Sequence, residues 1–243
     1  MSHLFHRDFR VDGSDADCFG YCRASVLHKA LVETASEHAE AAGFGRQAVF
    51  DQTGSFWILT RLSLHMSLPL RYDQAYTVLT WPRGIGGPFA YRDFEIMAGD
   101  RLAGEGTSAW VIANLQGGIL RPGDLPGLRE FTCPERPPKD LLKKLCAPEL
   151  QPAGHREIRY SDLDLNRHMN NVRYLDIACD LLALHNGPPS YLRHHQINYE
   201  AQCLPHEVLE LYRGRHPDGR IHIAGRAEGR NRFRIELTVE TQE

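Results

Sequence analysis

The stretch Tyr160-Ser161-Asp162-Leu163-Asp164-Leu165-Asn166-Arg167-His168-Met169-Asn170-Asn171-Val172 gathers carboxylates, side-chain amides and an imidazole in one short irregular run. A helical pattern follows at once, in which Val172, Leu175, Cys179 and Leu182 recur at spacings of three and four residues. A run this polar is poor core material, because each buried polar group needs a partner. It suits a site that transfers protons and polarises a carbonyl group. The rest of the chain is therefore interpreted as a scaffold for this loop.

The elements around the polar loop follow a simple order. A strand is predicted over 154–160 and a helix over about 171–185, with Asn170 or Asn171 as its N-cap and Asn186-Gly187-Pro188-Pro189 after its end. Strand-like runs then cover 192–203, 207–213, 220–226 and 232–241, and the last alternates apolar and polar residues throughout. The second half is thus predicted to be a strand, a helix and an antiparallel meander.

The first half repeats this order. A strand is predicted over 5–11 and a helix over 23–42, which Gly43 ends. The helix carries one apolar stripe made by Leu27, Leu31, Ala35, His38 and Ala42. Strand-like runs follow at 56–68, 75–81, 89–97 and 102–115, with Pro82-Arg83-Gly84 expected to end the second of them.

A repeat of element order predicts a duplicated unit. One helix for each set of strands favours an α+β fold over alternating βαβ units, and two such units can join their sheets. The predicted organisation is a first repeat over 1–120, a proline-rich linker over 121–153 with a short helical piece at 139–145, and a second repeat over 154–243.

Composition excludes several classes of protein. The 243 residues carry a formal net charge of -3, which gives no case for nucleic-acid binding. No apolar run approaches the roughly 18 residues that span a bilayer, and residues 1–8 lack the apolar core of a secretion signal, so a cytoplasmic protein without membrane contact is expected. The cysteines are irregularly spaced and are expected to be reduced. No histidine or cysteine spacing matches a zinc motif, and His194-His195 is a lone pair on a predicted strand.

The chain resembles a known family at this point. Ser161 to Tyr174 is very similar to the second-repeat signature of the acyl-carrier-protein thioesterases of plants and bacteria. The runs 57–62 and 76–82 resemble that family's first-repeat strand pair. The resemblance implies an α+β double hot-dog fold, in which two strand–long helix–antiparallel meander repeats share one extended curved sheet. It also implies hydrolysis of acyl-acyl-carrier-protein thioesters to a free fatty acid and the carrier thiol.

The family's functional positions carry over in part. Its essential Asp, Asn and His fall on Asp164, Asn166 and His168, and its later Glu-Cys pair falls on Gln202-Cys203. The Cys is thus present, whereas a Gln stands where the family has a Glu and cannot act as a base. The resemblance implies no metal and no bound cofactor, since the substrate itself carries phosphopantetheine. The implied partners are acyl carrier protein and a fatty acyl chain; a homodimer is left open.

Each candidate also has a structural interpretation. Asp164 is the leading site carboxylate, or it steers the loop; Asp162 is expected to be a turn or surface residue. His168 is the natural proton carrier near neutral pH, and water is preferred to Cys203 as the nucleophile. Cys203 is equally well read as a small buried apolar residue. Asn166 is expected to position water or the carbonyl group.

The remaining predictions concern substrate binding. Backbone N–H groups at Asn170 and Asn171 are candidates for stabilising the developing oxyanion. The acyl chain is expected under the first-repeat helix and sheet, with Phe56, Trp57 and Leu59 among the lining residues. A basic run, Arg226, Arg230, Arg232 and Arg234, is a second-choice surface for an acidic carrier protein. The alternative functions are a hot-dog thioesterase for acyl-CoA or polyketide thioesters, and a non-catalytic acyl-chain binder.

Overall fold

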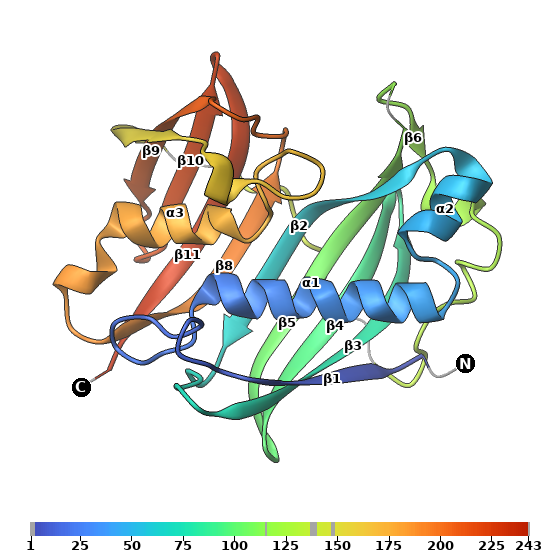
Figure 1. Ribbon diagram of the computed structural model, residues 1–243, viewed down its shortest axis with the longest axis horizontal. Coiled ribbons are helices and arrows are strands. Elements are labelled where there is room, and N and C mark those ends of the chain that lie inside the picture. The colour runs from blue at the N-terminus through green and yellow to red at the C-terminus, as the bar shows by residue number, and fades with distance from the viewer. Residues whose placement is uncertain (1–2, 115, 137–139, 147–148, 243) are drawn as a thin grey trace. The chain divides into compact units, whose positions relative to one another are not determined.

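The computed structural model describes residues 3–114, 116–136, 140–146 and 149–242. The chain divides into two compact units (Figure 1). The first unit comprises Met1–Val11, Ala30–Ser67 and Asp73–Leu142, and the second comprises Asp12–Lys29, Leu68–Tyr72 and Lys143–Glu243.

The first unit is an antiparallel sheet. Its strands pair in the order β1 (Phe5–Arg10), β3 (Ala75–Gly86), β4 (Phe89–Ala98), β5 (Arg101–Ala113) and β2 (Phe56–Met66), and the short β6 (Ile119–Leu120) pairs with β5. The predicted strand to residue 115 ends at Ala113, and Leu115 itself lies outside the described residues. Hairpins join β3 to β4 and β4 to β5, whereas β2 pairs with β5 and not with β3, so only β3, β4 and β5 follow one another in chain order.

Helix α1 (Ala24–Ala41) packs one stripe of side chains against neighbouring strands. Leu31, Ala35 and His38 are buried, as the stripe predicted. A Cβ at Gly106 of β5 would lie 3.3 Å from the Leu31 side chain, and Nδ1 of His38 lies 2.9 Å from Nη1 of Arg92 on β4. The part of α1 that belongs to the first unit therefore covers a face of that unit's sheet (Figure 1).

Two features of the first unit differ from the sequence expectation. β3 continues through Pro82 to Gly86, because the pairing with β4 shifts register between Pro82 and Gly84 and so accommodates a residue without an N–H donor. Helix α2 (Arg46–Thr53) was not predicted; its one buried residue, Val49, packs with Leu125 and Phe131 in a small separate core. A 3₁₀ turn, η1 (Pro122–Asp124), lies in the predicted linker, and no helix forms over the described residues 140–145; Lys139 lies outside them.

The second unit repeats the arrangement. Its strands pair in the order β8 (Ser190–Tyr199), β11 (Arg230–Thr241), β10 (Ile221–Ala227), β9 (Val208–Arg215) and β7 (Gln151–Glu157), all antiparallel. Helix α3 (Arg173–Leu182) follows the turn η2 (Tyr160–Asp162) and precedes the turn η3 (Leu184–Asn186). Leu175 and Ala178 of α3 are fully buried in one core with Ile197, Phe233 and Ile235 of the sheet.

Boundaries in the second unit also differ from the prediction: β7 covers Gln151–Glu157 and not 154–160, and α3 ends at Leu182 and not at about residue 185. β8 ends at Tyr199 and not at residue 203, because the N–H groups of Glu200 and Ala201 both donate to the carbonyl oxygen of Arg232 and so break the ladder. Helix α3 begins at Arg173 with Val172 as its N-cap, so neither Asn170 nor Asn171 occupies the N-cap position. Asn170 acts one step earlier, since its Oδ1 accepts the N–H of Val172 at 3.2 Å.

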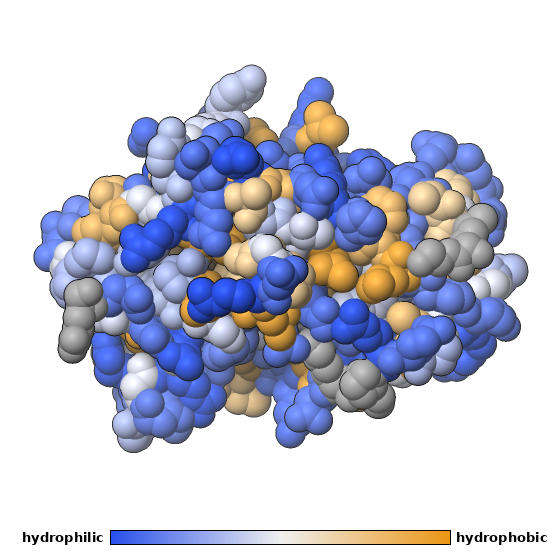
Figure 2. All heavy atoms as spheres, turned by 90° about the horizontal axis from the view of Figure 1, so that it is seen from below, coloured by the Kyte–Doolittle hydropathy of each residue, from blue (hydrophilic) through white to orange (hydrophobic). Residues whose placement is uncertain are grey.

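Hydrophilic residues cover most of the face shown in Figure 2, and hydrophobic residues gather there in smaller patches. Among the described residues, no helix is both long enough and apolar enough to cross a membrane.

Candidate active site

The polar loop of the second unit is a short closed turn held by the Asp164 carboxylate. An isolated bridge pairs Leu163 with Met169, and the N–H of Asp164 donates to the carbonyl oxygen of His168 at 2.9 Å. Oδ1 of Asp164 accepts the N–H of Asn166 at 2.7 Å and that of His168 at 3.3 Å. Arg167 completes the turn in the left-handed conformation, with φ 60°. Asp164 therefore fixes the backbone that presents Asn166 and His168.

The same loop occurs a second time, in front of α1, at residues 17–22. Here the bridge pairs Ala16 with Cys22, and the N–H of Asp17 donates to the carbonyl oxygen of Tyr21 at 2.8 Å. Oδ1 of Asp17 accepts the N–H groups of Phe19 at 2.9 Å and Tyr21 at 3.0 Å. The left-handed position is occupied by Gly20, with φ 78°.

Comparison of the polar loop with this twin loop, residues 17–22, distinguishes the side chains that hold the turn from those that could take part in a reaction. At the positions where the second loop carries Asn166, Arg167 and His168, the first carries Phe19, Gly20 and Tyr21. A carboxylate that closes the turn is thus needed in both loops, whereas the amide and the imidazole occur in the second alone. Asp164 therefore has a structural role that does not depend on catalysis, and Asn166 and His168 are the side chains that distinguish the polar loop.

Asp162 holds both ends of the polar loop through hydrogen bonds. It is 3% exposed, and its Oδ1 accepts Nη2 of Arg156 at 2.8 Å while its Oδ2 accepts the N–H of Arg159 at 2.9 Å. Its carbonyl oxygen accepts the N–H of Asn170 at 2.8 Å. The expectation of a surface residue was wrong, because a buried carboxylate with a guanidinium and an N–H donor is fully compensated. The expectation of a turn residue was correct, since Asp162 closes η2.

The start of α3 offers backbone donors, since the N–H groups of Asn171 and Tyr174 have no acceptor among the described residues. The N–H of Asn170 is taken by Asp162, and those of Val172 and Arg173 donate to the side chain and the carbonyl of Asn170. For the N–H of Asn171 no acceptor occurs among the described residues. Because it lies where the positive end of the helix dipole begins, it can donate to an incoming oxygen atom.

A tyrosine from β8 holds this helix start in place. The Tyr199 hydroxyl donates to the carbonyl oxygen of Asn171 at 2.9 Å and lies 3.1 Å from Nε2 of His28. Burial raises the pKa of the Tyr199 phenol well above its usual value, so the proton stays on the oxygen at any physiological pH. Neither Tyr199 nor His28 was singled out from the sequence.

Cys203 lies beside the polar loop but inside the core. Its carbonyl oxygen accepts the N–H of Met169 at 2.9 Å, so the segment after β8 is bound to the loop. The thiol is fully buried, and its Sγ accepts the Tyr174 hydroxyl at 3.5 Å. Burial raises the pKa of Cys203 to about 11, which keeps the sulfur protonated at neutral pH. These surroundings favour the buried, unreactive interpretation of Cys203, and its catalytic role stays a prediction.

The other predicted residues of the second unit vary in exposure. Gln202 is exposed, while His168 and Asp164 are half-buried and Asn166 is exposed. Because β8 has ended, strand alternation does not set the directions of Glu200 and Gln202. The nearest carboxylate along the chain, Glu200, pairs with Arg234 at 3.0 Å. The assignment of Asp164, Asn166, His168 and Gln202 as catalytic groups stays a prediction.

The proposed lining residues lie in the first unit. Trp57 is half-buried on β2, packs against the small core beneath α2, and donates from Nε1 to the carbonyl oxygen of Phe44 at 2.9 Å. Leu59 is buried and Phe56 is half-buried. Alternation along β2 puts Trp57 and Leu59 on one face and Phe56 on the other, so the three do not line one surface together.

The basic run is largely occupied by partners within the chain. Arg232 pairs with Glu207, Arg234 with Glu200, and Arg226 bonds Asn231 and lies over the Tyr212 ring. Such engaged side chains are poor candidates for a free cationic surface. Arg167 and Arg230 are exposed.

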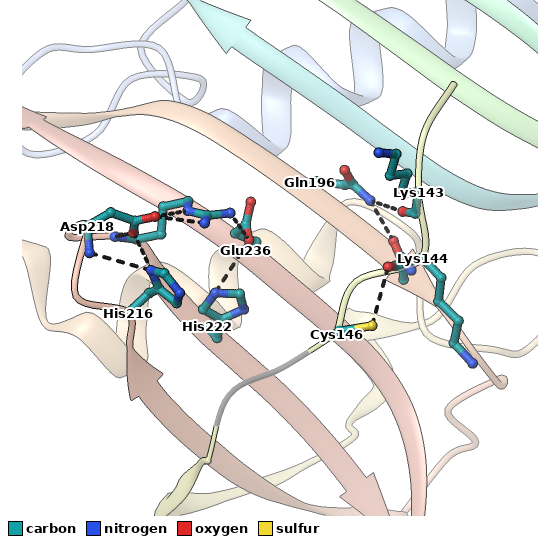
Figure 3. A network of polar contacts seen from close by, with 10 residues as sticks. Lys143, Lys144, Cys146, Gln196, His216, Asp218, His222 and Glu236 are labelled. Atoms are coloured by element: carbon teal, nitrogen blue, oxygen red, sulfur yellow. Dashed lines mark hydrogen bonds and ion pairs between the residues drawn. The ribbon is translucent and has the colours of Figure 1, made fainter. Parts of the chain in front are cut away.

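A second polar network, shown in Figure 3, joins a turn to the sheet of the second unit. His216 and Arg220 both contact the carboxylate of Asp218, Arg220 also contacts Glu236 at 2.8 Å, and Nε2 of His222 lies 3.4 Å from Glu236. Among the described residues, no three His, Cys, Asp or Glu side chains are grouped so that they could hold a metal ion. This network is accounted for by its own ion pairs.

Comparison with known proteins agrees with the resemblance. The sequence model of the acyl-ACP thioesterase N-terminal domain matches residues 2–117, and that of the C-terminal domain matches residues 151–241. The chain is 26% identical over 206 residues to the oleoyl-acyl carrier protein thioesterase of Coriandrum sativum, covering 74% of this chain and 54% of that protein. It is 25% identical over 240 residues to the palmitoyl-acyl carrier protein thioesterase of Cuphea hookeriana, covering 89% and 56%. The chain thus spans about half the length of these curated relatives.

Solved structures share the fold. An acyl-ACP thioesterase from Bacteroides thetaiotaomicron superposes with a TM-score of 0.89 at 23% identity, covering 99% of this chain and 100% of that one. The 12:0-ACP thioesterase from Umbellularia californica superposes with a TM-score of 0.79 at 16% identity, covering 100% and 99%. The predicted α+β double hot-dog fold is confirmed by these matches.

Proposed function

We propose that this chain, which belongs to the acyl-ACP thioesterase family, hydrolyses the thioester of an acyl chain carried on acyl carrier protein. The observation that carries the proposal is the difference between the twin loops. The two share one backbone and one carboxylate, yet an amide and an imidazole, the groups that a hydrolysis needs, occur in the second loop alone.

His168 is the proposed general base. Oδ1 of Asp164 already accepts two backbone N–H groups, so this oxygen is committed to holding the turn. An imidazole near neutral pH can accept a proton from water and return it later. Asn166, adjacent to the carboxylate on the same turn, is the proposed positioning group for that water.

The reaction then proceeds in two steps. The water oxygen attacks the thioester carbon while its proton passes to His168, and the carbonyl oxygen becomes an oxyanion that accepts the N–H of Asn171 at the start of α3. The tetrahedral intermediate collapses by breaking the carbon–sulfur bond, and the pantetheine sulfur takes the proton from His168. The products are a fatty acid and the carrier thiol. Every step uses groups of this chain and water.

The test measures thiol release from dodecanoyl-acyl carrier protein and from dodecanoyl-CoA, with His168→Ala as the variant. We expect His168→Ala to lower kcat by about 100-fold or more, the usual size for loss of a general base. His185→Ala is the matched control, since His185 is an exposed histidine just after α3. An unchanged kcat in His168→Ala would remove this residue from the mechanism.

The same assay separates the alternatives. Faster release from the carrier-protein substrate supports the proposal, and faster release from the CoA substrate supports an acyl-CoA thioesterase. Binding of an acyl ligand without thiol release supports a non-catalytic binder, for which the exposed Gln202 in place of a carboxylate is the motivating observation. A fatty-acid biosynthetic role, a cytoplasmic location and a homodimer stay predictions from the sequence.

A further inference from the structure

The core of the second unit contains two buried imidazoles that the proposed reaction does not use. His28 on α1 is 0% exposed and His195 on β8 is 1% exposed. Their rings are nearly parallel, with an interplanar angle of 16° and centroids 6.2 Å apart. His195 is paired with Leu237 of β11, and Ile197, two positions along the same strand, is fully buried in the apolar core of this unit.

The hydrogen bonds of Tyr199 determine which ring nitrogen of His28 carries the proton. A carbonyl oxygen can only accept, so the Tyr199 hydroxyl proton is committed to Asn171, and the hydroxyl oxygen must accept from Nε2 of His28. Burial lowers the pKa of His28 to about 3, and the ring is neutral at physiological pH. Its single proton is therefore on Nε2, and Nδ1 presents a lone pair.

That lone pair and both nitrogens of His195 lack partners. No hydrogen bond reaches Nδ1 of His28, or either ring nitrogen of His195, from any described residue. Burial also lowers the pKa of His195 well below its usual value, so this ring too is neutral, with one donor and one acceptor. Unsatisfied buried polar atoms destabilise a core and call for an explanation.

The free donor and acceptors of the two imidazoles fit a hydroxyl group better than a ketone or a methylene group. Between them the rings offer two acceptors and one donor. A hydroxyl group can donate to Nδ1 of His28 and accept from the protonated nitrogen of His195, and the two rings, with centroids 6.2 Å apart, are near enough for one group to contact both. A ketone oxygen can satisfy only the donor, and a methylene group satisfies neither.

The pair also lies close to the proposed oxyanion donor. The Tyr199 hydroxyl links Nε2 of His28 to the carbonyl oxygen of Asn171 through bonds of 3.1 and 2.9 Å. Two such bonds span at most about 6 Å. A group bound by the imidazoles is therefore within a few carbon atoms of a thioester that reacts at the start of α3.

We propose that His28 and His195 form a specificity site for a hydroxyl group near the thioester end of the acyl chain. The inference rests on the proposed function and narrows its substrate to hydroxylated acyl chains. Tyr199 acts as a positioning residue, since it fixes both the proton on His28 and the carbonyl of Asn171.

The experiment compares 3-hydroxydodecanoyl, 3-oxododecanoyl and dodecanoyl groups on acyl carrier protein. We expect kcat/KM for the hydroxylated chain to exceed that for the saturated chain about tenfold, the worth of one or two net hydrogen bonds, with the ketone between them. His195→Leu should remove this preference, so that the hydroxylated and saturated chains give equal kcat/KM values, and His195→Gln, which keeps a donor and an acceptor, should restore part of it.

Equal kcat/KM values for the hydroxylated and saturated chains in the unaltered protein would overturn the proposal, because the nitrogens would then be satisfied by buried water alone. If no thioester is hydrolysed, the proposed function fails, and calorimetric titration with 3-hydroxydodecanoate and dodecanoate tests the site by itself. About tenfold tighter binding of the hydroxy acid, lost in His195→Leu, would support the site, and equal affinities would overturn it.

Discussion

Replacing the carboxylate in each twin loop tests whether Asp164 is a scaffold or a reactant. Asp164→Ala removes two N–H···O bonds of 2.7 and 3.3 Å, and Asp17→Ala removes two of 2.9 and 3.0 Å. Hydrogen bonds to charged groups contribute about 1.5–3 kcal/mol when buried, and both aspartates are half-buried, so about 1 kcal/mol per bond is the appropriate figure. Each substitution should therefore lower the free energy of unfolding by about 2 kcal/mol, and Tm by about 4–8 °C for a chain of this length.

The assay pairs urea unfolding, followed by circular dichroism, with thiol release from an acyl-carrier-protein thioester. The Asp164→Asn variant is decisive, because the amide keeps an acceptor oxygen for the loop and loses only the charge and basicity. If Asp164 is a positioning residue, Asp164→Asn should stay within about tenfold of the original kcat. A loss of 100-fold or more at unchanged stability would refute this reasoning and place the carboxylate in the chemistry. Asp17→Ala, equal in its structural effect, should leave kcat nearly unchanged.

Two further predictions follow from buried side chains in the second unit. Because burial raises the pKa of Cys203 to about 11, iodoacetamide at pH 7.5 should alkylate the exposed Cys18 and Cys146 and leave Cys203 unmodified, as measured by mass spectrometry. Cys203→Ala should retain activity. Rapid labelling of Cys203 with loss of activity would restore it as a nucleophile. Gly225→Ala should lower the free energy of unfolding by about 1–3 kcal/mol, since its Cβ would lie 2.1 Å from the Phe233 ring, whereas Gly13→Ala, with its nearest atom at 4.0 Å, should be neutral. Equal stability of the two glycine variants in urea unfolding would contradict the packing argument.

Periodicity predicted the elements whose packing is local. The apolar stripe from Leu27 to His38 located α1 within one residue at each end, and the alternation from Arg232 to Thr241 located most of β11. The duplicated order of elements followed from the same pattern, and the long motif from Ser161 to Tyr174 pointed to the family. These features depend on residues close together in the chain, so a sequence displays them directly.

The errors arose where a contact with a residue outside the element itself decided the outcome. Pro82 does not end β3, because a register shift against β4 accommodates it. β8 ends early because the carbonyl oxygen of Arg232 captures two N–H groups. Asp162 is buried because Arg156 reaches it across the start of η2. None of these partners is visible in the local pattern.

The sequence predicted the polar residues of the candidate site, but not all of the contacts that hold them. Asn166 and His168 stood out as a group, but the twin loop at 17–22 and the tie from Tyr199 to Asn171 did not. Aligning the two halves on the aspartate in front of each helix, Asp17 and Asp164, would have found the twin. Tyr199 and His28 are 171 residues apart, and no sequence signal connects them.

The twin turns bear on how such proteins diversify. Their shape is encoded by one acidic side chain and one residue that accepts a positive φ, Gly20 in one copy and Arg167 in the other. The residues on either side of this positive-φ residue, Asn166 and His168 in one copy and Phe19 and Tyr21 in the other, differ while the turn stays the same. A duplicated ancestor could therefore gain or lose hydrolytic capacity in either half by exchanging two side chains, which makes enzymes of this architecture unusually ready to evolve.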